Sequence, residues 1–168
     1  MVPGTECVLG NVMQIDTPLN LYNKPKNKFV ATFIGAPRMN IFETTLFMDK
    51  GKMALKIDEN IIYLNEKMAK KVESHVNEKV WLGIRPENVE LIKGNIEGKE
   101  NLVKGEILVV EQMGNEEIIY FTIDGEQYIA RQSPDKKINL FPGEERYFHL
   151  DMDKCHIFDF ETKENISL

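Results

Sequence analysis

The stretch that decides the fold is "EILVVEQMGNEEIIYFTIDGEQYIARQ", which runs from Glu106 to Gln132. It contains three apolar runs, rich in β-branched and aromatic residues, that are separated by two short breaks. The first break is Gly114-Asn115, and the second is Asp124-Gly125, a dipeptide that suits a type I′ turn. This pattern predicts two consecutive β-hairpins that share their middle strand.

Further strand signals follow these hairpins. The runs "RYFHLDM" and "CHIFD" predict two more short strands, which come after the loops "SPDKK" and "FPGEE". With the hairpins they make about five short strands with tight turns in roughly the last 90 residues. Such an arrangement predicts a small Greek-key barrel of the OB type.

The part of the chain before the hairpins also has mainly strand patterns. "KVWLGIRP" is typical of a buried strand that ends at Pro86. From Asn40 onward apolar residues alternate, and "KMALKID" predicts one apolar strand face of Met53, Leu55 and Ile57. Asn65 is predicted to cap a short helix with an apolar stripe of Met68, Val72 and Val76.

The sequence begins with helical signals. Thr17-Pro18 is a helix start, and Pro25 is predicted to open a second helix that ends at Gly35 and Pro37. We expect one apolar face on this helix, formed by Phe29, Val30, Phe33 and Ile34. The face either caps the barrel of the same chain or docks on something else, since exposed apolar faces usually mark an interface. The predicted fold class is therefore mainly β, an OB-like Greek-key barrel with an N-terminal helix and one further short helix.

Composition excludes several classes of function. The chain has 168 residues, of which 21 are basic and 27 acidic, so its net charge is −6. Without a basic stripe, nucleic-acid binding is not expected. No apolar run approaches the roughly 20 residues that span a bilayer, and the first residues lack the features of a signal peptide. Cys7 and Cys155 lie far apart in the sequence, so a reduced, cytosolic context is the simpler interpretation.

A nucleotide-binding loop needs a glycine-rich turn that ends in Lys followed by Ser or Thr, because backbone amides and an ammonium hold the phosphates. The two Gly-Lys pairs of the chain, Gly51-Lys52 and Gly98-Lys99, are followed by Met53 and Glu100. Neither pair fits. We therefore predict that this chain has no catalytic residues and does not turn over ATP by itself.

His149, Cys155 and His156 are the candidates for a metal site. A structural zinc site needs four ligands at paired spacing, and adjacent residues of a strand point to opposite faces. No third group orients His156 toward Cys155 for thiolate chemistry. A half-buried strand is the favoured interpretation, so neither a metal site nor a cofactor site is predicted.

The other candidate groups lie in the strands and turns of the second half. The acidic pairs Glu116-Glu117 and Glu144-Glu145 flank turns, where solvated carboxylates are common, so they do not indicate acid–base catalysis. Three aromatic residues would serve as stacking residues for a nucleic acid: Tyr120, Phe121 and Tyr128. A groove of that kind also needs cations, and this hairpin is mainly acidic, so core packing is the favoured interpretation.

Four ordered segments resemble one known family. The first is "GNVMQIDTPLNLYNKPKNKFVATFIGAPRMNIFE", from Gly10 to Glu43, which matches the pattern P-x-x-L-Y-x-x-P-x-x-x-F-V-A-x-F-I-G-x-P-x-M-N. The others are "LGIRPENV" (Leu82 to Val89), "GEILVVEQMGNE" (Gly105 to Glu116) and "CHIFD" (Cys155 to Asp159). They resemble the ATPase subunits of bacterial ABC sugar importers, of the maltose and glycerol-3-phosphate importer type. The first dozen residues depart from this pattern, as does Asp16, where the family commonly has Gly.

This resemblance implies a domain organisation. Residues 38–168 would be a C-terminal regulatory domain with an OB-like fold, often called a TOBE domain. Residues 1–37 would be the remnant of the ATPase-domain C-terminus, with its linker helices. Because the ATPase core is absent, no P-loop, signature or Walker-B residue can be carried over. ATP and Mg²⁺ would bind only in that missing domain.

The same resemblance implies the partners and the location. The domain would form a homodimer with its copy in the partner subunit, contact its own ATPase domain and the membrane subunits, and in some members receive a regulatory protein. It would lie in the cytoplasm, at the inner face of the cell membrane. The expected interface residues are Phe29, Val30, Phe33, Ile34, Arg85, Glu87, Asn88, Gln112, Gly114, Asn115 and Glu116. The alternative is a free-standing OB-fold module that binds a small anion or an oligonucleotide, which salt-dependent binding to single-stranded nucleic acid would favour.

Overall fold

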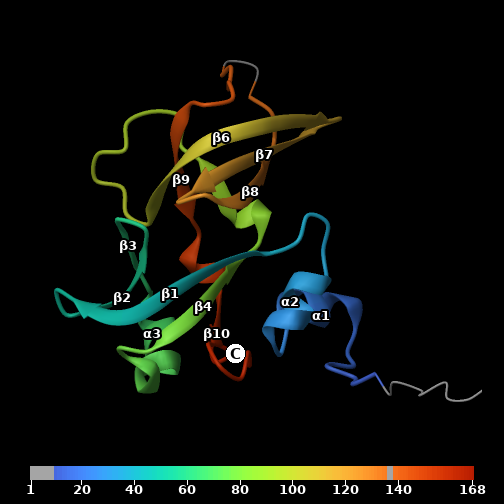
Figure 1. The fold of residues 1–168 in the computed structure, drawn as a ribbon, viewed down its shortest axis with the longest axis vertical. Coiled ribbons are helices and arrows are strands. Elements are labelled where there is room, and N and C mark those ends of the chain that lie inside the picture. The colour runs from blue at the N-terminus through green and yellow to red at the C-terminus, as the bar shows by residue number, and fades with distance from the viewer. Residues whose placement is uncertain (1–9, 136–137) are drawn as a thin grey trace, which may run out of the picture.

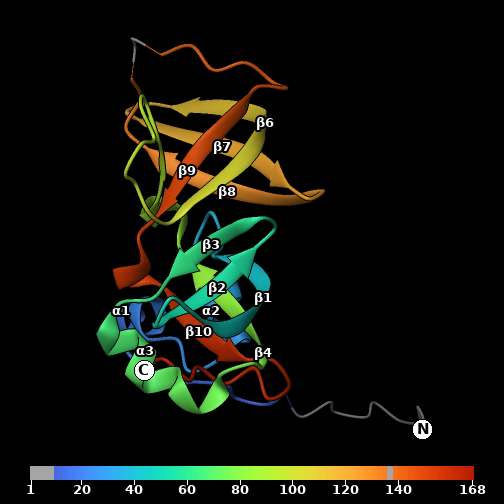
Figure 2. The same ribbon diagram turned by 90° about the vertical axis from the view of Figure 1, so that its left-hand side faces the viewer.

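The computed structural model describes residues 10–135 and 138–168, and its strands form two five-stranded antiparallel sheets. Figures 1 and 2 show the second sheet stacked above the first along the longest axis of the molecule. The first sheet has the order β10-β4-β1-β2-β3, with β1 (Asn40–Asp49), β2 (Lys52–Ile57), β3 (Asn60–Tyr63), β4 (Lys79–Ile84) and β10 (His156–Asp159). The second has the order β5-β9-β6-β7-β8, with β5 (Val89–Leu91), β6 (Leu102–Met113), β7 (Glu116–Ile123), β8 (Glu126–Gln132) and β9 (Glu145–Leu150).

The two hairpins predicted from the sequence are present in the second sheet, where β6 pairs with β7 and β7 pairs with β8. Asp124 and Gly125 have φ angles of 49° and 80°, both positive as a type I′ turn requires. Gly114 has a φ of 65° at the first hairpin, where Met113 pairs with Glu116. The hairpin prediction is confirmed.

The fold class is confirmed as mainly β and OB-like, but the strands of the last part of the chain are divided between two sheets. β10 pairs with β4 of the first sheet, whereas β9 pairs with β6 of the second. The short turn η3 (Met152–Lys154) separates them, and Ile157 and Phe158 of β10 are fully buried. The alternation of apolar and polar residues shows which face of a strand is buried, but it does not show which strand is its neighbour. The sequence therefore could not assign β10 to the first sheet.

Three short α-helices within the described residues accompany the sheets: α1 (Pro18–Asn23), α2 (Lys28–Phe33) and α3 (Glu66–Val72). The predicted caps Thr17 and Asn65 accept hydrogen bonds from the backbone N–H groups of Asn20 and Met68. α2 begins three residues later than expected from Pro25, because the side chain of Asn27 caps it. None of the helices within the described residues is long and apolar enough to cross a membrane.

One hydrophobic core extends through both sheets. Phe121 stacks on Phe148 within the second sheet, with 3.8 Å between ring centroids, and Tyr128 of β8 stacks on Phe42 of β1 at 4.1 Å. Asn40 of β1 also exchanges two hydrogen bonds of 2.8 Å with the backbone of β8. Phe121 and Tyr128 are therefore core residues, as the sequence favoured, and the two sheets form one packed unit.

A methyl group added at Gly105 should disturb this core. A Cβ atom there would lie 2.5 Å from Cδ2 of Phe121, whose ring is fully buried and stacked. We expect Gly105→Ala to lower the free energy of unfolding by about 1–3 kcal/mol, measured by urea denaturation. Gly94→Ala is the control, because no atom lies within 4 Å of its Cβ position. Equal stability of the two variants would contradict this account of the core.

Candidate functional site

The N-terminal helices lie beside the first sheet (Figure 1), and we call residues 17–37 the linker segment. Ala31 of α2 is fully buried and packs against Phe158 of β10. The ammonium of Lys28 lies 3.4 Å from the centroid of the Trp81 ring, in a cation–π contact. The linker segment is therefore docked on the sheet through both apolar and charged contacts.

The most extensive hydrogen bonding between the linker segment and the sheet comes from Arg85, which follows β4. Its Nη1 donates to the carbonyl oxygens of Ala31 at 3.0 Å and Ile34 at 2.5 Å, and its Nη2 donates to that of Tyr22 at 2.8 Å. The guanidinium carbon also lies 4.0 Å from the centroid of the Tyr22 ring. The last carbonyl groups of a helix lack partners within the helix and carry partial negative charge. One cation thus binds the C-terminal ends of both α1 and α2.

Arg85 is only 3% exposed, so the expectation that it lies at a dimer or partner surface is wrong. The sequence showed a polar residue beside a turn. It could not show that carbonyl groups from residues such as Ala31, 54 positions upstream, surround the guanidinium. Burial lowers the pKa of Arg85 below its usual value, and its Nε has no hydrogen-bond partner within the described residues.

Glu87 and Asn88, also expected at an interface, lie in the turn η2 (Pro86–Asn88). Glu87 is exposed, accepts a hydrogen bond from the hydroxyl of Tyr22, and has an oxygen 3.8 Å from Nη2 of Arg131. Asn88 is half-buried, and its carbonyl accepts a hydrogen bond of 3.0 Å from the backbone of Asp151. The structure gives both residues contacts within the chain, and their place in an interface stays a prediction.

The apolar face expected on α2 is divided. Val30 is 6% exposed and Ile34 is half-buried, whereas Phe29 and Phe33 are 56% and 73% exposed. The two phenylalanine rings stack on each other with 5.6 Å between centroids. Four residues at this spacing cover about 140° of a helix surface, so a flat contact with the sheet buries only one edge of the arc. This corrects the expectation of one continuous face and leaves two aromatic rings without cover from the described residues.

The β6–β7 hairpin presents the remaining expected interface residues. Four of them lie at its tip and are exposed: Gln112, Gly114, Asn115 and Glu116. Three apolar residues of β6 nearby are also exposed, at 39%, 45% and 58% respectively: Leu108, Val109 and Met113. We call these three residues the hairpin strip. The sequence assigned the polar tip to an interface but missed the apolar strip beside it, because β-branched runs are expected to be buried.

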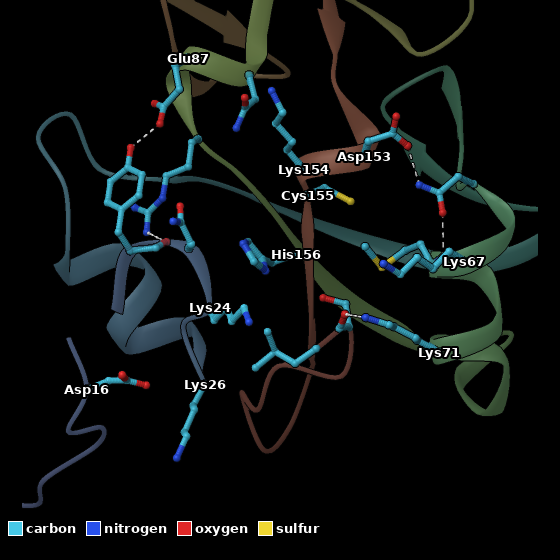
Figure 3. A pocket seen from close by; sticks show the side chains of 18 of the residues that line it. Asp16, Lys24, Lys26, Lys67, Lys71, Glu87, Asp153, Lys154, Cys155 and His156 are labelled. Carbon is cyan, nitrogen blue, oxygen red and sulfur yellow. Dashed lines mark hydrogen bonds between the residues drawn. The ribbon is translucent and has the colours of Figure 1, made fainter. Parts of the chain in front are cut away.

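A cavity of about 880 Å³ lies between the linker segment, α3 and β10. Figure 3 shows Lys24 and Lys26 on one side of it, Lys67 and Lys71 on the other, and His156 between them. We call it the linker cavity. The sequence did not predict it, because its walls come from parts of the chain that are far apart in the sequence.

Two residues of the linker cavity were candidates for metal binding or catalysis. Burial lowers the pKa of His156 to about 4, and the positive charges of Arg85 and Lys71 act in the same direction. Burial raises the pKa of Cys155 to about 12, and its Sγ donates to the carbonyl of Met152 at 3.2 Å. At neutral pH the imidazole is therefore uncharged and the thiol is protonated, which argues against Cys155 as a nucleophile.

Elsewhere in the described part of the chain, His75, Glu78 and Asp159 place ligand atoms within 4.8 Å of one another. Nε2 of His75 lies 3.8 Å from Oδ2 of Asp159. The other oxygen of Asp159 accepts hydrogen bonds from the backbone of residues 161 and 162. The carboxylate therefore has a structural role in this turn, and we assign no ligand to the group.

Two family models match adjoining parts of this architecture. Residues 35–89 match the MalK OB fold domain, and residues 82–158 match the TOBE domain. The chain contains a MalK OB fold domain and a TOBE domain. The two matches overlap at the passage from β4 of the first sheet to β5 of the second. The resemblance found in the four sequence segments is thereby confirmed for this TOBE-domain chain.

Known relatives of the TOBE-domain chain are ATP-binding proteins of ABC importers. It is 37% identical over 164 residues to the oligosaccharides import ATP-binding protein MsmX of Bacillus subtilis, covering 94% of this chain and 42% of that protein. It is 35% identical to the osmoprotective compounds uptake protein GgtA of Synechocystis and to the multiple sugar-binding transport protein MsmK of Streptococcus mutans. These two alignments cover 92% of this chain and 41% of each relative. The TOBE-domain chain thus spans about two fifths of these relatives, in their C-terminal region.

A solved structure supports the fold of the TOBE-domain chain. The molybdate-bound form of the cytoplasmic molybdate-binding protein ModG superposes with a TM-score of 0.54 at 13% sequence identity. The superposition covers 70% of this chain and 94% of that one. At this identity the likeness concerns the fold alone.

Replacement of Arg85 should release the linker segment. Arg85→Met removes three hydrogen bonds and leaves three carbonyl groups without their donor, so we expect the free energy of unfolding to fall by about 3 kcal/mol. Amide hydrogen exchange should accelerate in residues 18–34 more than in the sheets. Arg131→Met is the control, because a partly exposed ion pair contributes about 1 kcal/mol or less. Equal losses in both variants would contradict the role of Arg85.

His156 should make the domain sensitive to acid. Its folded pKa of about 4 lies below the usual 6.5, so between these values the unfolded chain binds a proton that the folded chain does not. Stability therefore decreases as the pH falls from 6.5 to 4, by at most about 1.4 kcal/mol per pH unit from this residue. We expect His156→Gln to flatten this slope in urea denaturation at pH 7 and pH 5. An unchanged slope would show that other groups cause the acid sensitivity.

Proposed function

We propose that this chain is the regulatory and dimerisation domain of an ABC sugar-importer ATPase subunit, and that it has no catalytic activity of its own. One observation carries the proposal. The alignments cover more than nine tenths of this chain, yet they cover only the C-terminal two fifths of ATP-binding proteins. The Gly-Lys pairs of the sequence also lack the residues that a phosphate-binding loop needs.

We assign the linker segment to the connection with the ATPase domain. In this proposal residues 1–37 are the end of that domain and residues 38–168 are the regulatory domain, although residues 1–9 lie outside the described residues. The exposed rings of Phe29 and Phe33 support this assignment, because stacked aromatic rings at a surface usually mark a contact with another surface. The ATPase core of the full subunit is the proposed occupant of this contact.

For the dimer, we assign the β6–β7 hairpin as the contact surface. The hairpin strip exposes three apolar side chains next to the polar tip, and an apolar centre with a polar rim is the usual anatomy of a protein interface. The opposite surface would be the same hairpin of a second copy, since twofold contacts are the commonest in homo-oligomers. The hairpin belongs to the second sheet, whereas the linker segment packs on the first, so one chain can make both contacts at once.

The names of the relatives support the remaining parts of the proposal. Because they are import proteins that bind ATP, the full subunit would act in the cytoplasm at the inner face of the membrane, together with the transporter's membrane subunits. ATP and Mg²⁺ would bind in the ATPase domain. A regulatory protein is a further proposed partner. The rival function, a free-standing OB-fold module, has the weaker support, because the alignment continues through the linker segment into the relatives' sequence.

Light scattering across a range of concentrations tests the dimer. We expect the mass of the wild-type chain to rise toward twice that of one chain, and Val109→Glu/Met113→Glu to stay monomeric, because charges in an apolar contact lose their hydration. Met48→Glu is the matched control, since Met48 is 52% exposed but belongs to the first sheet. A wild-type chain that is monomeric at every concentration, or a control that dissociates equally, would refute this interface.

A further inference from the structure

The linker cavity concentrates positive charge in a chain that is acidic as a whole. The net charge of the chain is −6. Nevertheless, the residues that line the cavity include three acidic ones, Asp16, Glu87 and Asp153, and six basic ones, Lys24, Lys26, Lys67, Lys71, Arg85 and Lys154. Basic groups still outnumber acidic ones when the carboxylate of Leu168, another lining residue, is counted. Clefts lined by one sign of charge concentrate ligands of the opposite sign.

The acidic residues of the cavity form no ion pair with its basic residues among the described residues. Asp16 accepts hydrogen bonds from the backbone of Thr17 and the side chain of Asn20, and these bonds lower its pKa, as does the charge of Lys26. Glu87 accepts from Tyr22 and faces Arg131, which lies outside the cavity lining. Asp153 accepts from Asn65 at 2.6 Å. Each carboxylate therefore has a partner other than the lysines of the cavity.

Among the described residues, five of the six basic residues form no ion pair, whereas Lys154 pairs with Asp151, which is not a lining residue, at 3.6 Å. Among the described residues, Lys24, Lys26 and Lys67 form no ion pair, and Lys71 donates to the carbonyl of Ser167 at 2.9 Å. Lys67 and Lys71 are four positions apart on α3, so they lie on one face and repel each other. The C-terminus of α3 favours a cation at Lys71, but Lys67 is in the first half of the helix and gains nothing from it.

Arg85 adds a buried charge that forms no ion pair among the described residues, although the charge of Glu87 favours its charged form. It is 3% exposed, its described partners are backbone carbonyl groups, and its Nε has no hydrogen-bond partner within the described residues. Buried charges in proteins are usually paired, because removing a charge from water is costly. Burial lowers the pKa of His156, and the charges of Arg85 and Lys71 act in the same direction.

We propose that the linker cavity binds a small phosphorylated molecule, such as a sugar phosphate, whose phosphate group supplies the missing negative charge. A volume of about 880 Å³ lies within the range of roughly 300–1,000 Å³ that is usual for small-molecule sites. Lysine ammonium groups on opposite walls suit a phosphate, which accepts hydrogen bonds from several directions. The polar side chains of the lining suit a hydrated, sugar-like body. This site goes beyond the proposed regulatory and dimerisation role.

The position of the site implies that a bound ligand would hold the linker segment against the first sheet. Lys24 and Lys26 belong to the linker segment, whereas Lys67 and Lys71 belong to α3. Figure 3 shows Lys24 on one side of His156 and Lys67 and Lys71 on the other, while the side chain of Lys26 points away from His156. A bound phosphate that contacts both walls would tie the linker segment to the first sheet in addition to Arg85. Binding would therefore slow amide exchange in the linker segment.

Isothermal titration of the chain with glucose 6-phosphate tests the proposal, with glucose as the uncharged control and inorganic phosphate as a separate arm. We expect glucose 6-phosphate to bind, glucose not to bind, and the affinity to fall as salt is raised. Lys24→Gln/Lys67→Gln should weaken binding by about tenfold or more, since two charge contacts are lost. Lys99→Gln, an exposed lysine outside the cavity, should leave it unchanged.

Comparing glucose 6-phosphate with inorganic phosphate shows whether the ligand is a sugar phosphate or free phosphate. Inorganic phosphate that binds as tightly as glucose 6-phosphate would identify free phosphate as the ligand and would support the site. Amide chemical shifts measured by NMR should change at Lys24, Lys67 and His156. The proposal is overturned if neither compound binds, if the double variant binds as well as the wild type while remaining folded, or if the shifts change only elsewhere. The dimer measurement is independent of each of these outcomes.

Discussion

The structure depends on the way in which one buried cation, Arg85, holds the ends of two short helices. Helices of six residues are unstable by themselves, because few hydrogen bonds offset the cost of nucleation. The guanidinium satisfies carbonyl groups at both C-terminal ends and stacks on Tyr22. Gly35 permits this approach, since a Cβ atom there would lie 3.1 Å from Nη1 of Arg85, and its φ of 118° is unfavourable for other residues. Together with the packing of Ala31 against Phe158 and of Lys28 on Trp81, this contact positions the linker segment.

The same interaction connects the fold with the proposed functions. Arg85 lies where β4 leaves the first sheet, and the chain passes through the next turn into the second sheet. Arg85 therefore lies next to the linker segment, the linker cavity and the turn that leads from the first sheet to the second. Asn40 and the stacked aromatic rings join the two sheets in one close-packed core. A displacement of the linker segment would therefore be transmitted to both sheets together. This arrangement suits the proposed function, in which the domain connects an ATPase core with a second copy.

Local chemistry explains which parts of the fold could be predicted. Asp124-Gly125 sets its turn through residues that tolerate positive φ, and Thr17 and Asn65 cap helices with their own side chains. Such signals depend on residues within four positions of each other. The position of β10, by contrast, depends on its partner β4, more than 70 positions upstream. The hairpin strip could not be predicted either, because the apolar pattern of β6 is the same whether its outer face meets water or a second chain.

The sequence by itself determined the hairpins, the helix caps, the mainly β class and the family, because each of these is encoded in short runs of residues or in ordered motifs. Only the tertiary structure decided that Arg85 is buried, that Val30 and Phe33 face different surroundings, and that lysines from three distant segments surround one cavity. The physical reason is the range over which each interaction acts. Turn and helix preferences act between neighbours in the chain, whereas burial and charge act between neighbours in space, which the fold alone brings together.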